Sequence, residues 1–111
     1  MSELATVTAR DLPDARLICV SGEVDLSNVA EVTAAIRRSI PSDTSLVIID
    51  LSQTAYLDSA GLAMLFRFGE RLGYSRQELC LVVPPDSPVR RVLELTSLTR
   101  VIRVEETVPG R

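Results

Sequence analysis

The feature that most constrains the fold of this chain is the stretch between residues 46 and 72. It opens with four consecutive apolar residues at 46–49. A run without a polar position indicates a strand that is covered on both faces, as in the centre of a sheet backed by helices. After a short polar connection, apolar residues recur at helical spacing from Leu57 to Leu72. We therefore expect a buried strand whose following turn delivers Ser59 to the start of an amphipathic helix.

The other segments predict a chain in which strands and helices follow one another. A weak alternation, a turn around Pro13 and a second apolar run indicate that the first two strands form a hairpin. Later apolar runs are separated by segments with helical periodicity. The predicted strands are 4–8, 16–21, 46–49, 78–83 and 101–104, and the predicted helices are 29–40, 57–72 and 88–96.

Several residues carry signals for the ends of these helices. Ser27 or Asn28 can cap the first helix, and Asn28 with Glu31 three residues later resembles a capping box. Gly73 is expected to cap the C-terminal end of the second helix. Ser87, which precedes a proline, is a typical start of the third helix.

These elements indicate an α/β protein with the order β-β-α-β-α-β-α-β. Strands that alternate with helices favour parallel crossovers, so we expect a mixed sheet of about five strands with three main helices. The sheet should be largely parallel in its second half, with helices over at least one face. A chain of 111 residues fits a single domain. We expect its core at 4–104 and a flexible tail at 105–111.

The composition argues against an enzyme. The chain has no histidine, and all twelve of its basic residues are arginine. It therefore lacks an imidazole base for a nucleophilic triad and a lysine for a phosphate-binding loop or a Schiff base. Cys19 and Cys80 lie in apolar runs and form no CxxC pair, so they are interpreted as core residues. We expect no cofactor and no metal site.

Charge and hydropathy also limit the partners. The formal net charge is −3, and the only basic doublets, Arg37-Arg38 and Arg90-Arg91, lie on predicted helices as solvated faces. A protein that binds nucleic acid directly usually has a basic stripe, so such binding is not expected. No apolar run approaches the length that spans a bilayer, and the N-terminus lacks the features of a signal peptide. We expect a cytoplasmic protein without membrane insertion.

Ser59 lies where the signals for a helix start converge, and two interpretations are open. In the first, Ser59 or Asp58 serves only as an N-cap, which is a common structural role for both residue types. Alternatively, Ser59 presents its hydroxyl to a partner: Ala60 and Gly61 leave it unshielded, and the buried strand before it fixes its position. Asp58 would then help to orient a phosphate donor through a metal ion.

Met64 and Phe68 are four residues apart on the second helix and lie off its main apolar stripe. They could form a surface for a partner together with Arg67. The interpretation that we favour is that both side chains line the edge of the core.

Three short motifs occur in order along the chain. They are Gly22-Glu23-Val24-Asp25, Asp50-Leu51-Ser52 and Leu57-Asp58-Ser59-Ala60-Gly61-Leu62. Together they resemble the small anti-sigma factor antagonists of bacteria, which are built on the STAS domain (sulphate transporter and anti-sigma antagonist). The resemblance extends from the strand at 17–20 to Val104. One departure is Thr96-Ser97-Leu98, where the family often has Thr-Gly-Leu, so a left-handed cap is less favourable there.

The resemblance implies a STAS-type fold and a switch at Ser59. In the family, this serine is phosphorylated by an anti-sigma factor that is a serine kinase with a histidine-kinase-like ATPase fold. The unphosphorylated antagonist binds that kinase and frees a sigma factor for stress response or sporulation, and a PP2C-type phosphatase resets the switch. Asp25 and Asp58 match acidic residues near the phosphosite. Glu23 is the second acidic residue of the Gly22–Asp25 motif. It either belongs to the phosphosite environment with Asp25 or is an ordinary charged residue at the end of a strand.

The sequence is compatible with two other functions. The same fold could serve as a STAS scaffold or ligand-binding subunit of a transporter or a larger signalling assembly, without phosphorylation of Ser59. An enzyme that uses Asp25 and Asp58 with a metal ion is the weakest alternative, because the chain lacks histidine and lysine.

Overall fold

The computed structural model describes residues 4–110 of the chain. Within these residues, no helix is both long enough and apolar enough to cross a membrane. In chain order the elements are β1 (Ala5–Leu12), β2 (Ala15–Val24), α1 (Val29–Arg38), β3 (Leu46–Asp50), β4 (Thr54–Leu57), α2 (Ser59–Tyr74), β5 (Glu78–Val82), α3 (Arg90–Glu94), α4 (Leu98–Val101) and β6 (Arg103–Glu105).

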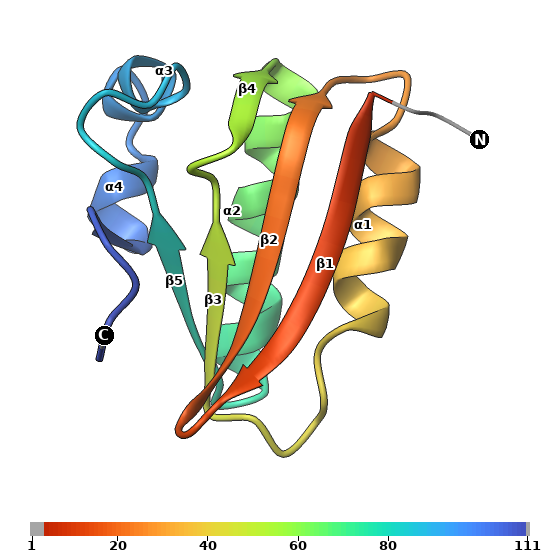
Figure 1. Ribbon diagram of the computed structural model, residues 1–111, viewed down its shortest axis with the longest axis vertical. Coiled ribbons are helices and arrows are strands. Elements are labelled where there is room, and N and C mark those ends of the chain that lie inside the picture. The colour runs from red at the N-terminus through yellow and green to blue at the C-terminus, as the bar shows by residue number, and fades with distance from the viewer. Residues whose placement is uncertain (1–3, 111) are drawn as a thin grey trace.

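The sheet is mixed, and helices cover one of its faces. Its strand order is β1-β2-β3-β5-β6, and β4 pairs with β2 alone. The β1–β2 hairpin is antiparallel, whereas every other pair is parallel. Helices α1 and α2 lie behind the sheet in Figure 1, and α3 and α4 lie beside its β5 side. The predicted α/β fold, the hairpin and the parallel second half are confirmed, with β3 at the centre.

Strand β4 was not predicted, because residues 54–57 look like a polar connection. They are extended because they continue the sheet beside the end of β2, where Glu23 pairs with Tyr56 and Val24 with Leu57. The buried Thr54 hydroxyl donates a hydrogen bond to the Val20 carbonyl oxygen at 2.7 Å. This bond fixes the start of β4 and hence the turn that leads into α2.

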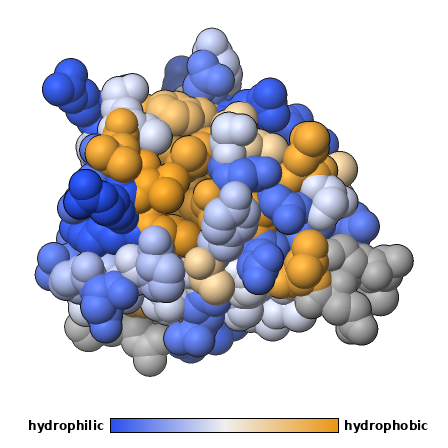
Figure 2. Space-filling model, turned by 90° about the horizontal axis from the view of Figure 1, so that it is seen from above, coloured by the Kyte–Doolittle hydropathy of each residue, from blue (hydrophilic) through white to orange (hydrophobic). Residues whose placement is uncertain are grey.

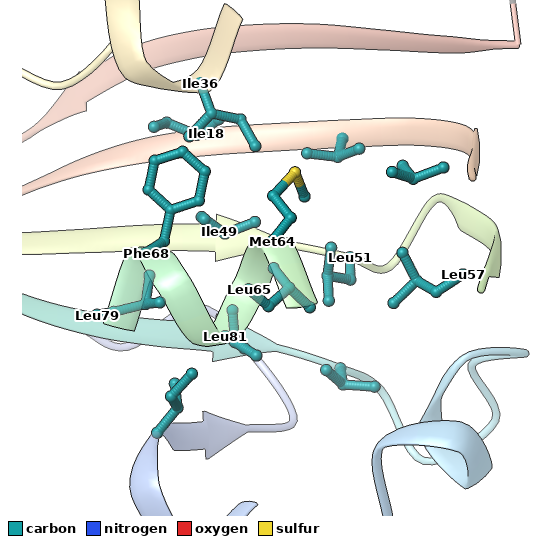
Figure 3. Packing of buried hydrophobic residues seen from close by; sticks show 14 of the residues in the cluster. Ile18, Ile36, Ile49, Leu51, Leu57, Met64, Leu65, Phe68, Leu79 and Leu81 are labelled. Atoms are coloured by element: carbon teal, nitrogen blue, oxygen red, sulfur yellow. The ribbon is translucent and has the colours of Figure 1, made fainter. Parts of the chain in front are cut away.

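The main core fills the space between the sheet and the two long helices. Figure 3 shows Ile18 and Ile49 of the sheet facing Ile36 of α1 and the side chains of α2. Met64 is 3% exposed and Phe68 is 4% exposed, so both belong to this core rather than to a surface patch. Burial of each such side chain contributes about 1.5–3 kcal/mol to folding.

A smaller cluster lies on the other face of the sheet. Leu17, Ile48, Cys80 and Val82 are buried there, and Val108 of the tail is partly buried against them. Burial raises the pKa of the Cys80 thiol to about 11, so it stays protonated at neutral pH. The interpretation of the cysteines as core residues is confirmed for Cys80, whereas Cys19 is only partly buried.

Two of the predicted helix caps are wrong. Helix α1 begins at Val29, but Asn28 makes no side-chain capping bond. Gly73 lies inside α2, and the chain turns instead at Arg76, whose φ of 58° is left-handed. The Gln77 N–H donates to the Leu72 carbonyl at 2.8 Å and the Arg76 N–H donates to the Gly73 carbonyl at 3.1 Å. This pair of bonds is a Schellman motif with arginine in place of glycine.

Replacing Arg76 by glycine should therefore stabilise the protein. A left-handed conformation destabilises a residue that has a side chain by roughly 1–2 kcal/mol. Glycine avoids this strain, but it loses more conformational entropy on folding, which offsets part of the gain. For Arg76→Gly we expect a gain of about 0.5 kcal/mol in the free energy of unfolding, measured by chemical denaturation. Ser75→Gly is the control, because Ser75 has a φ of −92° and glycine brings no relief there; an equal gain in both variants would contradict the explanation.

The third predicted helix, 88–96, is shorter than expected, and a second short helix follows it. The Ser87 hydroxyl accepts a bond from the Val89 N–H at 3.3 Å, but regular helix begins only at Arg90. Ser97 has a φ of −86°. The chain thus turns here in the ordinary right-handed region, as the missing glycine of the Thr96-Ser97-Leu98 departure requires. Helix α4 was not predicted. It includes Val101, the first residue expected in the last strand, and β6 starts two residues later than predicted, at Arg103.

Candidate functional site: a serine at the start of α2

The site lies where two neighbouring parallel strands end. Val24 of β2 and Leu57 of β4 are paired, so Asp25 and Asp58 follow them at the same edge of the sheet. The Leu26 N–H donates to Asp58 Oδ2 at 3.0 Å, which joins the loop before α1 to the start of α2. The sequence motifs around Glu23–Asp25 and Asp58–Gly61 are therefore brought together in space.

Asp58 is the residue that caps α2. Its Oδ1 accepts bonds from the N–H groups of Ala60 at 2.9 Å and Gly61 at 3.0 Å. With the bond from Leu26, both carboxylate oxygens are occupied by backbone donors. Asp58 thus fixes the position of the helix start, and the question of which residue is the N-cap is decided in its favour.

Ser59 is the first residue of α2, and its side chain is exposed. Its hydroxyl makes no hydrogen bond to any residue that the structure describes. Because Asp58 caps the helix, the Ser59 hydroxyl has no part in the local structure. It stands on a fixed backbone and is accessible to another protein.

Asp25 and Asn28 hold the neighbouring loop. Asp25 Oδ1 accepts bonds from both the N–H and the hydroxyl of Ser27, and these bonds hold the pKa of Asp25 below its usual value. The Asn28 side chain is buried and connects two parts of the loop: its Oδ1 accepts from the Asp25 N–H at 2.9 Å, and its Nδ2 donates to the Glu23 carbonyl at 2.8 Å. Asn28 was predicted only as a cap, and its role in positioning Asp25 was missed.

Gly61 is buried and Ala60 is partly buried. A methyl group added at Gly61 would lie 2.9 Å from Leu57 Cδ2 and 3.3 Å from the Val24 carbonyl oxygen. The absence of a side chain therefore lets α2 pack closely against the ends of β2 and β4. Gly61 thereby helps to fix the position of Ser59, rather than leaving open space around it.

The exposed apolar residues of this end were not predicted. Leu26 is 78% exposed and Tyr56 is 50% exposed, and they lie on the loop after β2 and on β4. Figure 2 looks down on this end of the molecule and shows apolar side chains gathered to the left of its centre, with hydrophilic ones around them. The available signal was a leucine between Asp25 and Ser27, in a loop that is otherwise polar. An apolar centre with a polar rim is the usual composition of a protein-binding surface.

Both oxygens of the Asp58 carboxylate are engaged by backbone N–H groups. Among residues 4–110, no group of three or more Asp, Glu or Cys side chains is placed to hold a metal ion. Asp58, one of the two carboxylates considered for such a role, already accepts three backbone hydrogen bonds. What the arrangement offers to another molecule is an exposed hydroxyl, nearby acids and an apolar surface.

Removing the Asp58 carboxylate should loosen the whole site. Asp58→Ala leaves three backbone N–H groups without their acceptor, and we expect a loss of about 2 kcal/mol in the free energy of unfolding. Asp58→Asn is the control because it keeps one acceptor oxygen, and it should lose about half as much. Chemical denaturation measures both values. Equal and negligible losses would show that the capping bonds do not hold the start of α2.

Comparison with known proteins agrees with this geometry. A model of the STAS domain family matches residues 6–110. The anti-sigma-F factor antagonist RsfB of Mycobacterium tuberculosis is 31% identical over 103 residues, which are 93% of this chain and 83% of the relative. The crystal structure of an anti-sigma factor antagonist from Mycobacterium paratuberculosis is 27% identical, with a TM-score of 0.83, and the match covers 94% of this chain and 87% of that one.

A more distant solved structure shares the fold. The Bacillus cell fate determinant SpoIIAA, in its phosphorylated form, is 18% identical with a TM-score of 0.61, over 89% of this chain and 90% of that one. The family model spans nearly the whole chain, and the curated relative matches it almost end to end. The chain therefore belongs to the STAS domain family and, within it, to the anti-sigma factor antagonists, which are regulatory proteins and not enzymes.

Proposed function

We propose that this protein is a phosphorylation-controlled antagonist of an anti-sigma factor. Its unphosphorylated form binds an anti-sigma factor that is also a serine kinase with a histidine-kinase-like ATPase fold, and thereby releases a sigma factor. Phosphorylation of Ser59 ends this binding, and a PP2C-type phosphatase restores it. In this proposal the protein acts in the cytoplasm, and it contacts neither nucleic acid nor membrane. The carrying observation is the exposed Ser59 hydroxyl, which takes no part in capping α2.

The position of Ser59 suits a kinase substrate. A kinase must bring the hydroxyl oxygen into line with the phosphate that it transfers, which needs an accessible group in a fixed place. Ser59 is exposed, while Asp58 fixes the backbone on one side of it and the buried Gly61 packs on the other. Phosphorylation can therefore proceed without unfolding of α2.

The same geometry explains how a phosphate would act. At a free helix start, backbone N–H groups can donate hydrogen bonds to a phosphate. Here the N–H groups of Ala60 and Gly61 already donate to Asp58. A phosphate on Ser59, with about −1.5 to −2 charges at neutral pH, would stay at the surface beside that carboxylate.

A partner that covers this surface would have to bury the phosphate next to a like charge. Moving a complex from mostly bound to mostly free takes about 5 kcal/mol, which burial of an unpaired dianion can supply. The fold itself should tolerate the phosphate, because the Ser59 side chain is exposed and makes no hydrogen bond to a described residue that phosphorylation would break. The named neighbour SpoIIAA, which shares this fold, has been solved in a phosphorylated form.

The residues around Ser59 form the surface that the anti-sigma factor would contact. Leu26 and Tyr56 supply exposed apolar area, and tyrosine is enriched among residues that dominate binding energy. Glu23 and Asp25 lie at the same end and would provide polar contacts at the rim. This combination supports a specific and reversible contact.

Site mapping tests this proposal. The protein is mixed with Mg-ATP and an anti-sigma kinase from the same genome, and the product is examined by intact mass and peptide mapping. We expect a single added phosphoryl group, located on Ser59 and absent from Ser59→Ala. Ser42→Ala, an exposed serine in a distant loop, is the matched control and should still be modified. If no such kinase binds or modifies the protein, the scaffold function without phosphorylation gains support.

A further inference from the structure

Strand β1 is an open edge of the sheet. It is eight residues long and has no neighbour beyond it among the described residues, whereas β6 at the opposite edge has only three residues. The Glu23 N–H donates to the Leu4 carbonyl, and antiparallel pairs alternate, so even-numbered residues of β1 direct their backbone groups towards β2. The backbone groups of Ala5, Val7 and Ala9 therefore point outward. A long open edge of this kind is a template for pairing with another strand.

A groove runs along this edge, between β1 and α1. Its volume is about 360 Å³, and Ala5 and Val7 of β1 line it together with residues of α1. Figure 1 shows β1 at the side of the sheet with α1 next to it. Because β1 forms one wall of the groove, an element added beside β1 would lie next to it.

The face of α1 that lines the groove has a distinctive composition. Glu31, Ala34, Ala35 and Arg38 have the spacing i, i+3, i+4, i+7, which places them on one stripe. The two alanines let another helix approach closely, and the charges at the two ends of the stripe are opposite. Val32, which also lines the groove, and Ile36 are the buried residues of α1.

We propose that this edge joins two copies of the chain. β1 pairs antiparallel with β1 of a second copy, which extends the sheet across the dimer, and α1 packs against the second α1. A two-fold axis makes the helices antiparallel, so Glu31 of each copy faces Arg38 of the other. The opposite charges at the two ends of the stripe are the reason to assign a second copy rather than an unrelated partner.

The spacing of the elements fits this arrangement. Helix α1 contacts both β1 and β2, so its axis lies over this pair of strands. Across the new strand pair, the two α1 helices would be two strand spacings apart, or about 10 Å. Helices pack at 8–10 Å, at the short end when their contact residues are small, as Ala34 and Ala35 are. The sheet and the helix layer can therefore pair at the same time.

The dimer would leave the serine site free. Figure 1 places β1 at the side of the sheet, whereas β4 and the start of α2 lie at its upper end. Two copies would thus present two Ser59 surfaces, and the dimer forms whether or not Ser59 is phosphorylated. Its test is independent of the kinase experiment.

Analytical ultracentrifugation of the full chain tests the dimer. At high protein concentration we expect a mass of about 24 kDa, twice the 12.1 kDa of one chain. Ala9→Pro removes an outward N–H without removing a bond to β2, and it should weaken the dimer. Arg38→Glu places like charges opposite each other and should weaken it about tenfold or more, as should Glu31→Arg. The double variant Glu31→Arg/Arg38→Glu exchanges the charges and should restore the dimer.

Arg37→Glu is the matched control. It makes the same change of charge at the adjacent residue of α1, but Arg37 lines a different groove, between α1 and α2. It should leave the dimer unchanged, and circular dichroism shows that each variant is folded. A monomer at every concentration would overturn the proposal. The proposal would also be overturned if Ala9→Pro and Arg38→Glu left the dimer affinity unchanged, or if the double variant Glu31→Arg/Arg38→Glu did not dimerise.

Discussion

Gly22→Ala should destabilise this protein by about 3 kcal/mol, the largest effect that we expect from a single methyl group. Gly22 has a φ of 96°, in a region that residues with side chains rarely adopt. An added methyl group would lie 2.0 Å from the Leu4 carbonyl oxygen, which belongs to the backbone and cannot move aside alone. The pairing between β2 and β4 shifts register between Gly22 and Glu23, so this residue also directs the strand end towards the site.

Gly73→Ala is the control for this substitution. A methyl group added at Gly73 meets no atom within 4 Å, and alanine is favoured over glycine inside a helix. This variant should be more stable by about 0.5 kcal/mol when both are measured by chemical denaturation. If Gly22→Ala were as stable as the wild type, the backbone conformation assigned to the end of β2 would be wrong.

Ser59→Asp should break the complex with the anti-sigma factor while leaving the fold intact. Burial of one unpaired carboxylate at an interface costs about 2–5 kcal/mol, so we expect the affinity to fall by about a hundredfold or more. The free energy of unfolding should change by less than about 0.5 kcal/mol, because the exposed Ser59 side chain makes no internal hydrogen bond among the described residues. Titration calorimetry and chemical denaturation measure the two quantities.

Ser42→Asp is the matched control, since it adds the same charge at an exposed serine in the loop after α1. It should bind like the wild type. If the Ser59→Asp variant unfolds, Ser59 has a structural role. If the variant is folded and binds with normal affinity, an electrostatic switch at Ser59 is excluded.

The long elements were predictable because their patterns are strong. The apolar residues at 46–49 predict the buried β3, and the periodicity after Leu57 predicts α2. β4 was missed because Ala55 and Tyr56 are exposed and no alternation marks the segment. Its strand conformation comes from pairing with β2, which is distant in sequence and leaves no local signal.

The site was predictable in its residues but less so in their roles. The resemblance to the family brought Glu23, Asp25, Asp58 and Ser59 into one proposal, and the structure places them at one end of the sheet. The hydrogen bonds of Asn28 could not be inferred, because an asparagine before a helix is usually its cap. Side-chain bonding depends on which loops meet in three dimensions, and periodicity says nothing about that.

Helix ends show the same limit. Gly73 was the natural choice for a cap, yet α2 continues past it and turns at Arg76. The turn falls there because the chain must enter β5, where the Glu78 N–H donates to the Ser45 carbonyl at 2.8 Å. The position of the next strand thus overrides the local preference for glycine.

The central claim is that the phosphate on Ser59 decides whether the anti-sigma factor is bound. The most direct measurement is the dissociation constant of one wild-type sample in three states: unphosphorylated, phosphorylated by the kinase, and treated afterwards with the phosphatase. We expect tight binding, a loss of about a thousandfold or more, and full recovery. Equal affinity in the unphosphorylated and phosphorylated states would contradict the account.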